Sequence, residues 1–97
     1  MLRSNDLDYL FEAILTMKSV DECYRFFEDI CTIKELQSMA QRMQVAKQLN
    51  DNKNYVQVIE DTGVSSATIS RVNKCLQYGN GGYKLALDRL AGGNGNE

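Results

Sequence analysis

The sequence has no proline and no histidine, and only three of its 97 residues are cysteines. Without proline, helices can run uninterrupted between short polar turns. Without histidine, the chain lacks the usual general base and the commonest metal ligand. It also has no evident nucleophile–base pair or metal-ligating cluster. We therefore expect neither an enzyme, nor a metal site, nor a bound cofactor.

The cysteines, Cys23, Cys31 and Cys75, are scattered, and no two stand at C-x-x-C spacing. This argues against a disulfide framework or a zinc site and predicts reduced, buried thiols. The chain has no run of 18 apolar residues, and it turns polar and acidic by Asp6. We therefore expect no membrane span and no signal peptide, and hence a cytoplasmic protein.

Charge is unevenly distributed, although the net charge is only −2. Residues 1–30 carry three cations and seven anions, whereas residues 31–97 carry eight cations and six anions. This balance does not by itself indicate nucleic-acid binding. It does indicate that an anionic partner would meet the second part of the chain.

Apolar residues recur at helical spacing, and no segment alternates convincingly with period two, which predicts an all-α fold. Capping boxes begin at Ser19 (S-x-x-E) and at Thr32 (T-x-x-E). Asn54 is followed by Gln57 at its third helical position, and Ser65 or Ser66 caps a later helix. The six predicted helices cover residues 6–18, 19–31, 32–49, 55–61, 66–78 and 83–90.

A chain of this length has room for one domain, which we place at residues 1–91. The glycine-rich end, 92–97, offers no core residue and is expected to be a disordered tail. The apolar faces of the first two helices are wide for a small monomer. They predict an intertwined homodimer in which the partner completes the core.

Residues 55–74 fit a helix-turn-helix, within a segment that we place at 54–78. The motif requires apolar residues at its fourth, tenth, fifteenth and eighteenth places and glycine at its ninth, because two helices cross steeply there. Ile59 departs from the small residue preferred at the fifth place, which predicts a slightly wider crossing or compensation elsewhere. The matching residues are Val58, Gly63, Val64, Ile69 and Val72.

The outward residues of the second helix of this motif are hydroxyls, amides and cations, with no acid between residues 62 and 82. A helix that enters the major groove needs such a face. The alternative is a plain helical hairpin with a solvated polar face. The predicted DNA-binding residues are Lys53, Tyr55, Ser65, Ser66, Thr68, Ser70, Arg71 and Lys74.

Three segments are distinctive: Thr32 with Glu35, the run from Gln41 to Ala46, and above all Ala67-Thr68-Ile69-Ser70-Arg71. On these, residues 32–76 resemble the Trp repressor family, and more closely its Trp-repressor-like branch of uncharacterised bacterial regulators. The last segment is similar to the A-T-I-T-R run of the family's recognition helix. The spacing of the preceding residues also suits the family's first two helices.

The resemblance implies a six-helix fold and a homodimer whose N-terminal helices interlock. It implies operator DNA as the partner, contacted in two successive major grooves. In the Trp repressor, L-tryptophan is a corepressor whose indole lies between two arginines. The counterparts of those arginines here are Arg42 and Arg71.

Two positions of this pocket depart from the family pattern. Val72 stands where the Trp repressor has glycine, and Cys75 replaces a serine that helps to hold the ligand's amino group. We therefore expect a filled slot and no response to L-tryptophan, while a smaller effector in a pocket of Arg42, Arg71, Val72 and Cys75 stays open. Alternatively, the arginines bind phosphates or pair with acids such as Glu60.

The sequence thus favours a dimeric, sequence-specific DNA-binding regulator, a repressor with a near-palindromic operator. The competing hypothesis is a protein-interaction adaptor that kept the repressor fold without specific DNA binding. The near-neutral charge and the two cations on the outward helix face motivate this alternative. The operator sequence, the regulated genes, the effector and the sign of regulation cannot be derived from the sequence.

Overall fold

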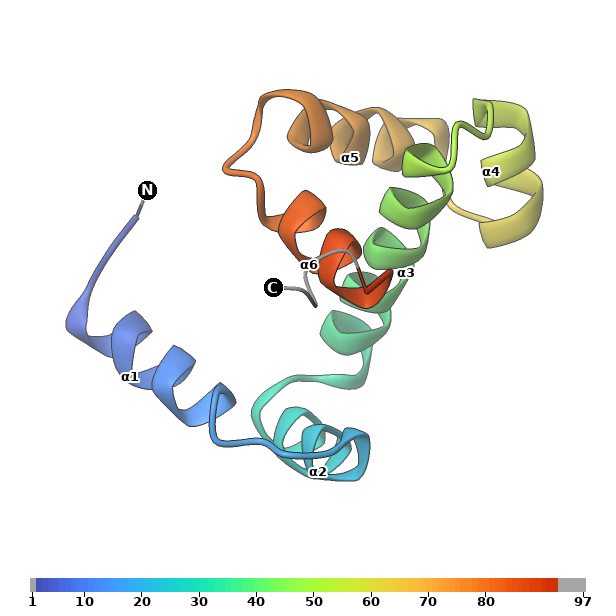
Figure 1. Ribbon diagram of the computed structural model, residues 1–97. Helices are drawn as coiled ribbons and strands as arrows, with labels where there is room; N and C mark the ends of the chain where they lie inside the picture. Colours follow the sequence, from blue (N-terminus) through green and yellow to red (C-terminus); the bar gives the residue numbers. More distant parts are fainter. Residues whose placement is uncertain (1, 93–97) are drawn as a thin grey trace. The chain divides into compact units, whose positions relative to one another are not determined.

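The computed structural model describes residues 2–92 (Figure 1). Over these residues the chain forms six helices and no strand, as predicted. The helices are α1 (Asn5–Ile14), α2 (Val20–Ile30), α3 (Ile33–Asn50), α4 (Tyr55–Thr62), α5 (Ser66–Tyr78) and α6 (Gly82–Leu90). The chain divides into two compact units, residues 1–37 and 38–97, and α3 begins in the first unit.

The predicted boundary of one domain at residue 91 stays a prediction. The predicted disorder of residues 92–97 falls, from residue 93 onward, outside the described residues.

Side-chain caps start most of the helices where the sequence predicted. Before α3, Glu35 accepts the backbone N–H of Thr32 at 2.8 Å, and the hydroxyl of Thr32 accepts the N–H of Glu35 at 3.1 Å. The backbone N–H bond from Thr32 is the main reason that the pKa of Glu35 lies below its ordinary value. Asn54 and Gln57 form the same reciprocal capping box at α4.

The first helix is shorter than predicted, because it ends at Ile14 rather than at residue 18. The N–H groups of Thr16 and Met17 bond to carbonyls three residues back, and the Thr16 hydroxyl donates to the carbonyl of Ala13 at 2.7 Å. These tighter bonds close the helix early.

The predicted capping box at α2 forms only in half. Ser19 accepts the N–H of Glu22, but the Glu22 carboxylate accepts the N–H of Lys18 instead of that of Ser19. The acid thus stabilises the turn that precedes the cap, which joins α1 to α2.

The second unit contains every buried residue of the described chain, and all of them are apolar. α3 supplies two, the α4–turn–α5 segment supplies four, and α6 supplies one. Met43, Leu49, Leu76 and Tyr83 pack around this cluster as partly buried residues. The core residues are Val45, Ala46, Val58, Val64, Ile69, Val72 and Leu87.

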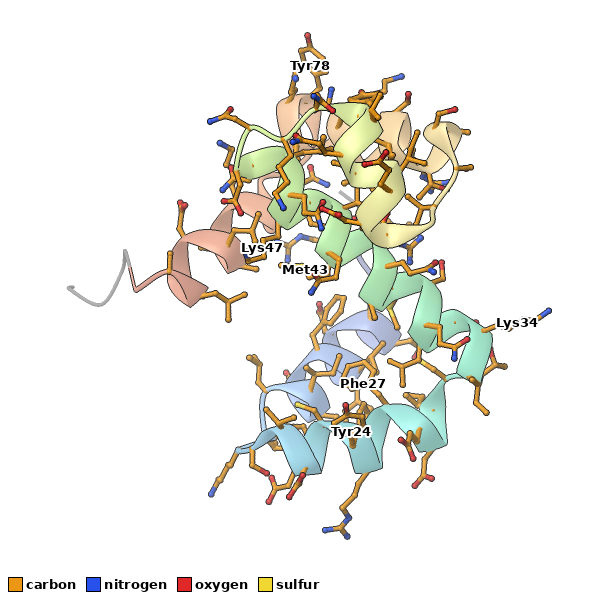
Figure 2. All side chains as sticks on the ribbon, turned by 90° about the vertical axis from the view of Figure 1, so that its right-hand side faces the viewer. Tyr24, Phe27, Lys34, Met43, Lys47 and Tyr78 are labelled. Carbon is orange, nitrogen blue, oxygen red and sulfur yellow. The ribbon has the colours of Figure 1, made fainter. Side chains whose placement is uncertain are left out.

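The first unit has no buried residue among those described. Large apolar side chains are exposed on α1, directly after it and on α2: Tyr9 is 76% exposed, Leu15 83% and Tyr24 59%. Figure 2 shows Tyr24 and Phe27 on α2 within this unit. Residues 2–37 therefore enclose no core of their own.

The predicted burial of the cysteines is wrong. All three are free thiols, with Cys23 and Cys31 half-buried and Cys75 exposed. Cys75 follows Val72 by three residues, but only Val72 is directed into the core.

We predict that Ile69→Val lowers the free energy of unfolding by about 0.5–1.5 kcal/mol, because it removes a methyl group from a fully buried site. Ile59→Val makes the same chemical change at a side chain that is 38% exposed and should stay within about 0.5 kcal/mol of the parent. Urea denaturation of both variants measures the difference. Equal losses would contradict the described core.

Candidate nucleic-acid interface

α4, the turn at Gly63 and α5 form the predicted helix-turn-helix. All four predicted apolar positions of the motif are buried, and Gly63 has the left-handed conformation, with φ of +72°. Its N–H donates to the carbonyl of Ile59 at 2.8 Å and closes α4. Gly63 thus turns the chain, and Val58, Val64, Ile69 and Val72 fix α5 against α4 (Figure 1).

Burying this apolar side leaves the polar side of α5 in solvent. Ser66, Ser70, Arg71 and Lys74 are exposed, and Thr68 is half-buried. The side chain of Tyr78, at the end of α5, points away from the unit and is 80% exposed (Figure 2). The predicted hydroxyl and cationic residues of α5 are therefore accessible or half-buried, and α5 itself carries no acidic residue.

Ser65 has a structural role that its assignment as a contact residue did not include. Its hydroxyl oxygen accepts the backbone N–H of Thr68 at 3.2 Å and so caps α5. The same oxygen lies 3.2 Å from Oγ1 of Thr68, with either hydroxyl able to donate. Ser65 therefore both starts the helix and orients the side chain of Thr68.

Lys53 and Tyr55 lie at the other end of the motif, around the start of α4. Tyr55 is 38% exposed. The Nζ atom of Lys53 lies 3.4 Å from Oδ2 of Asp61, and the two side chains are 43% and 47% exposed. This ion pair was not predicted from the sequence, because the two residues are eight positions apart and only the folding of α4 brings them together.

The four predicted pocket residues line one cavity of about 300 Å³ in the second unit. Arg42 comes from α3, whereas Arg71, Val72 and Cys75 come from α5. Sequence reasoning missed its other lining residues, Met39, Met43 and Tyr83. Tyr83 comes from α6, whose contact with α5 no local pattern indicates.

The side chain of Val72 does not fill the pocket, contrary to the prediction from the sequence. Val72 is 1% exposed because its isopropyl group is directed into the core, and a cavity stays open beside it. Two guanidinium groups and no carboxylate belong to the lining, so the cavity favours an anionic group.

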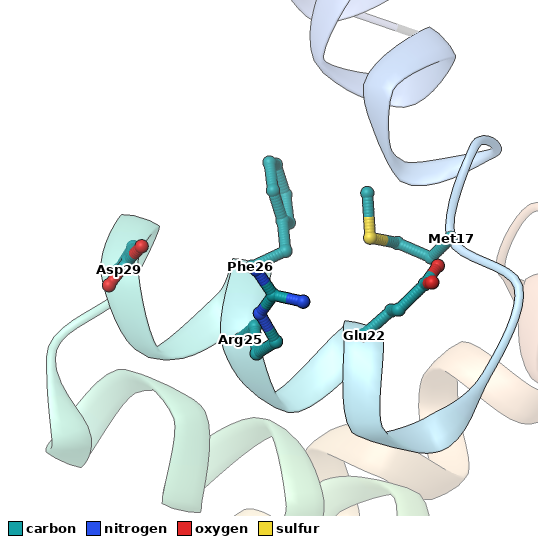
Figure 3. Close-up of a pocket in the computed structure, with 5 residues that line it drawn as sticks. All are labelled: Met17, Glu22, Arg25, Phe26 and Asp29. Carbon is teal, nitrogen blue, oxygen red and sulfur yellow. The ribbon is translucent and has the colours of Figure 1, made fainter.

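A second hollow, of about 320 Å³, lies in the first unit and was not predicted (Figure 3). Met17 and Phe26 supply the apolar part of its lining. The charged part consists of Arg25 and two acidic residues, Glu22 before it and Asp29 after it in the sequence of α2. Within the described residues, no group of three or more histidine, cysteine or acidic side chains is arranged to hold a metal ion.

The family model described as the Trp repressor protein matches residues 5–91 of the chain. The chain belongs to the Trp repressor family. This is a family of regulatory DNA-binding proteins rather than of enzymes, and its model spans all six helices described here.

Three relatives of this Trp repressor family member span nearly the same length. An uncharacterized protein of Bacillus subtilis, YerC, is 54% identical over 89 residues, which are 92% of this chain and 86% of that protein. A crystal structure of a presumed Trp repressor from Staphylococcus aureus is 48% identical, with a TM-score of 0.89 over 92% of this chain and 89% of its own. A TrpR-like protein from Eubacterium eligens is 50% identical, with a TM-score of 0.89 over 93% of both chains.

These structures confirm the predicted six-helix, Trp-repressor-like fold. None of the described helices combines the length and the apolar character needed to cross a bilayer.

Proposed function

We propose that this chain is a sequence-specific DNA-binding regulator of transcription, a repressor that acts as a homodimer on a near-palindromic operator. The observation that carries the proposal is the accessible, acid-free polar face of α5, held by a buried aliphatic corner behind the turn at Gly63. Membership of the Trp repressor family supports it.

Each predicted contact residue has a chemical role in this proposal. Lys53, Arg71 and Lys74 supply positive charge for phosphates, and Tyr55 supplies a phenol at the start of α4. Thr68, Ser66 and Ser70 offer hydroxyls to base edges in the major groove. Ser65 acts mainly through Thr68, since its hydroxyl is engaged at the helix cap.

The exposed apolar side chains of the first unit support the proposed dimer. The helices of this unit leave large apolar side chains exposed, and each is worth roughly 1.5–3 kcal/mol when fully buried. A second copy offers the same apolar faces, and a twofold dimer places two α5 helices on half-sites about one helical turn apart.

The adaptor stays the alternative. The net charge of −2 and the pairing of Lys53 with Asp61 favour it, because both weaken attraction to phosphate. An adaptor would bind a protein through the same exposed faces and would bind no duplex in a salt-dependent way.

The proposed regulator does not respond to L-tryptophan. Cys75 offers a thiol where the family pattern has a serine hydroxyl, and Val72, whose isopropyl group packs in the core beside the cavity, stands where that pattern has glycine. Arg42 and Arg71 remain suited to the carboxylate or phosphate of a smaller effector.

Selection of bound duplexes from a random pool, followed by titration of the best site, tests DNA binding. Thr68→Ala should lower the preference for the best site by about 1–3 kcal/mol, because it removes a base contact. Lys74→Ala should weaken all duplexes alike, because it removes a phosphate contact. Lys34→Ala, at the start of α3, is the matched loss of charge and should change little. If the Thr68 and Lys74 variants both bind like the parent, the interface lies elsewhere.

Dimerisation is tested by sedimentation and by unfolding at several protein concentrations. We expect a dimeric mass at micromolar protein and a melting temperature that rises with concentration, because association stabilises the folded chain. A monomeric mass at micromolar protein would exclude the proposed dimer.

Titration calorimetry with millimolar L-tryptophan should show no binding, and DNA affinity should not change. The thiol at position 75 removes a hydrogen bond worth roughly 1.5–3 kcal/mol to a charged amino group. Cys75→Ser, at an exposed position outside the core, should restore some binding, provided that circular dichroism shows the variant folded. A micromolar dissociation constant for the parent would contradict the expectation.

A further inference from the structure

Two ion pairs within 4 Å occur among the described residues, and they offer a natural comparison. Lys53 pairs with Asp61 at 3.4 Å, across the length of α4. Lys47 pairs with Asp51 at 3.2 Å, one turn apart near the end of α3. Only the first pair includes a predicted DNA-binding residue.

Resting on the proposed function, we propose that Asp61 is an internal competitor for DNA: its carboxylate occupies Lys53 in the free protein and must be displaced before that lysine can bind a phosphate. Asp61 thereby lowers affinity for any duplex and sets how strongly the protein adheres to DNA of unrelated sequence.

The geometry makes the exchange feasible. Both side chains are about half exposed, so water and a phosphate can approach the ammonium group without disturbing the core. A lysine ammonium is a compact point charge that either a carboxylate or a phosphate oxygen can neutralise. The two anions are therefore alternative partners for one cation.

The position of Asp61 indicates that the pair is not needed to build the motif. Asp61 lies in the last turn of α4, where a negative charge opposes the helix dipole. The start of α4 is already capped by Asn54 and Gln57, and its end is closed by Gly63. Removing the carboxylate should thus leave the fold intact.

The test compares Asp61→Asn, Asp51→Asn, Lys53→Gln and the double variant Lys53→Gln/Asp61→Asn. Each is titrated with one fluorescent duplex of random sequence at several salt concentrations. Asp51→Asn is the matched control, because it removes the same charge from the other pair. Circular dichroism checks that every variant is folded.

We expect Asp61→Asn to bind about two- to fivefold more tightly than the parent, as the loss of an exposed pair of this kind allows. Its salt slope should steepen by up to about 0.9, the value of one neutralised phosphate. Asp51→Asn should change affinity by less than half as much on a logarithmic scale. The double variant should bind like Lys53→Gln, because Asp61 acts through the lysine.

Two results would overturn the inference alone. Equal gains in Asp61→Asn and Asp51→Asn would mean that only net charge matters. A gain that survives in the Lys53→Gln background would mean that Asp61 repels DNA directly. If the parent shows no salt-dependent binding to any duplex, the proposed function fails first, and this inference falls with it. If the parent binds duplex DNA and Lys74→Ala weakens that binding, the proposed function holds, and a failed Asp61 comparison counts against this inference alone.

Discussion

Burial of four aliphatic side chains at one corner, Val58, Val64, Ile69 and Val72, is the constraint on which the rest of the second unit depends. These side chains pack with Val45 and Ala46 of α3 in one buried cluster, which fixes the orientation of α5. The polar side of α5 therefore faces solvent. Close-packed interiors resist changes of even one methyl group. The position of the α5 backbone is therefore fixed by the core behind it.

The first unit is stabilised in a different way. Its helices begin at well-formed caps, with Ser4 and Ser19 each accepting a backbone N–H three residues later. Caps of this kind contribute only about 0.5–2 kcal/mol each, and short helices need tertiary burial to persist in water. The two units therefore differ in what stabilises them: a buried apolar core in the second unit, and local hydrogen bonds without buried side chains in the described part of the first.

Features that depend on residues close together in the chain could be predicted from the sequence. Thr32 with Glu35, Asn54 with Gln57, and Gly63 each act within a few residues of their own position, and their roles were predictable from spacing alone. The aliphatic places of the helix-turn-helix were predictable for the same reason, because the turn fixes how the two helices meet.

Features that depend on the path of the chain were not predictable. Lys53 meets Asp61 only because α4 has a particular length, and Tyr83 joins the cavity only because α6 returns to α5. The early end of α1 was missed because the Thr16 side chain and tight backbone bonds compete with an apolar pattern that continues past Ile14. The cavity that stays open beside Val72 likewise depends on how α3, α5 and α6 pack together, which a motif position does not give.

The hydroxyl pair at the start of α5 has a consequence for how an operator can change over time. Oγ of Ser65 and Oγ1 of Thr68 share one hydrogen bond whose direction is free, so rotation of two protons turns the Thr68 hydroxyl from donor to acceptor without moving a heavy atom. Adenine presents a donor and thymine an acceptor at the corresponding edge of the major groove. Under the proposed function, a base pair opposite Thr68 can therefore be inverted while its hydrogen bond is kept. Binding sites can drift at that position while the protein stays the same.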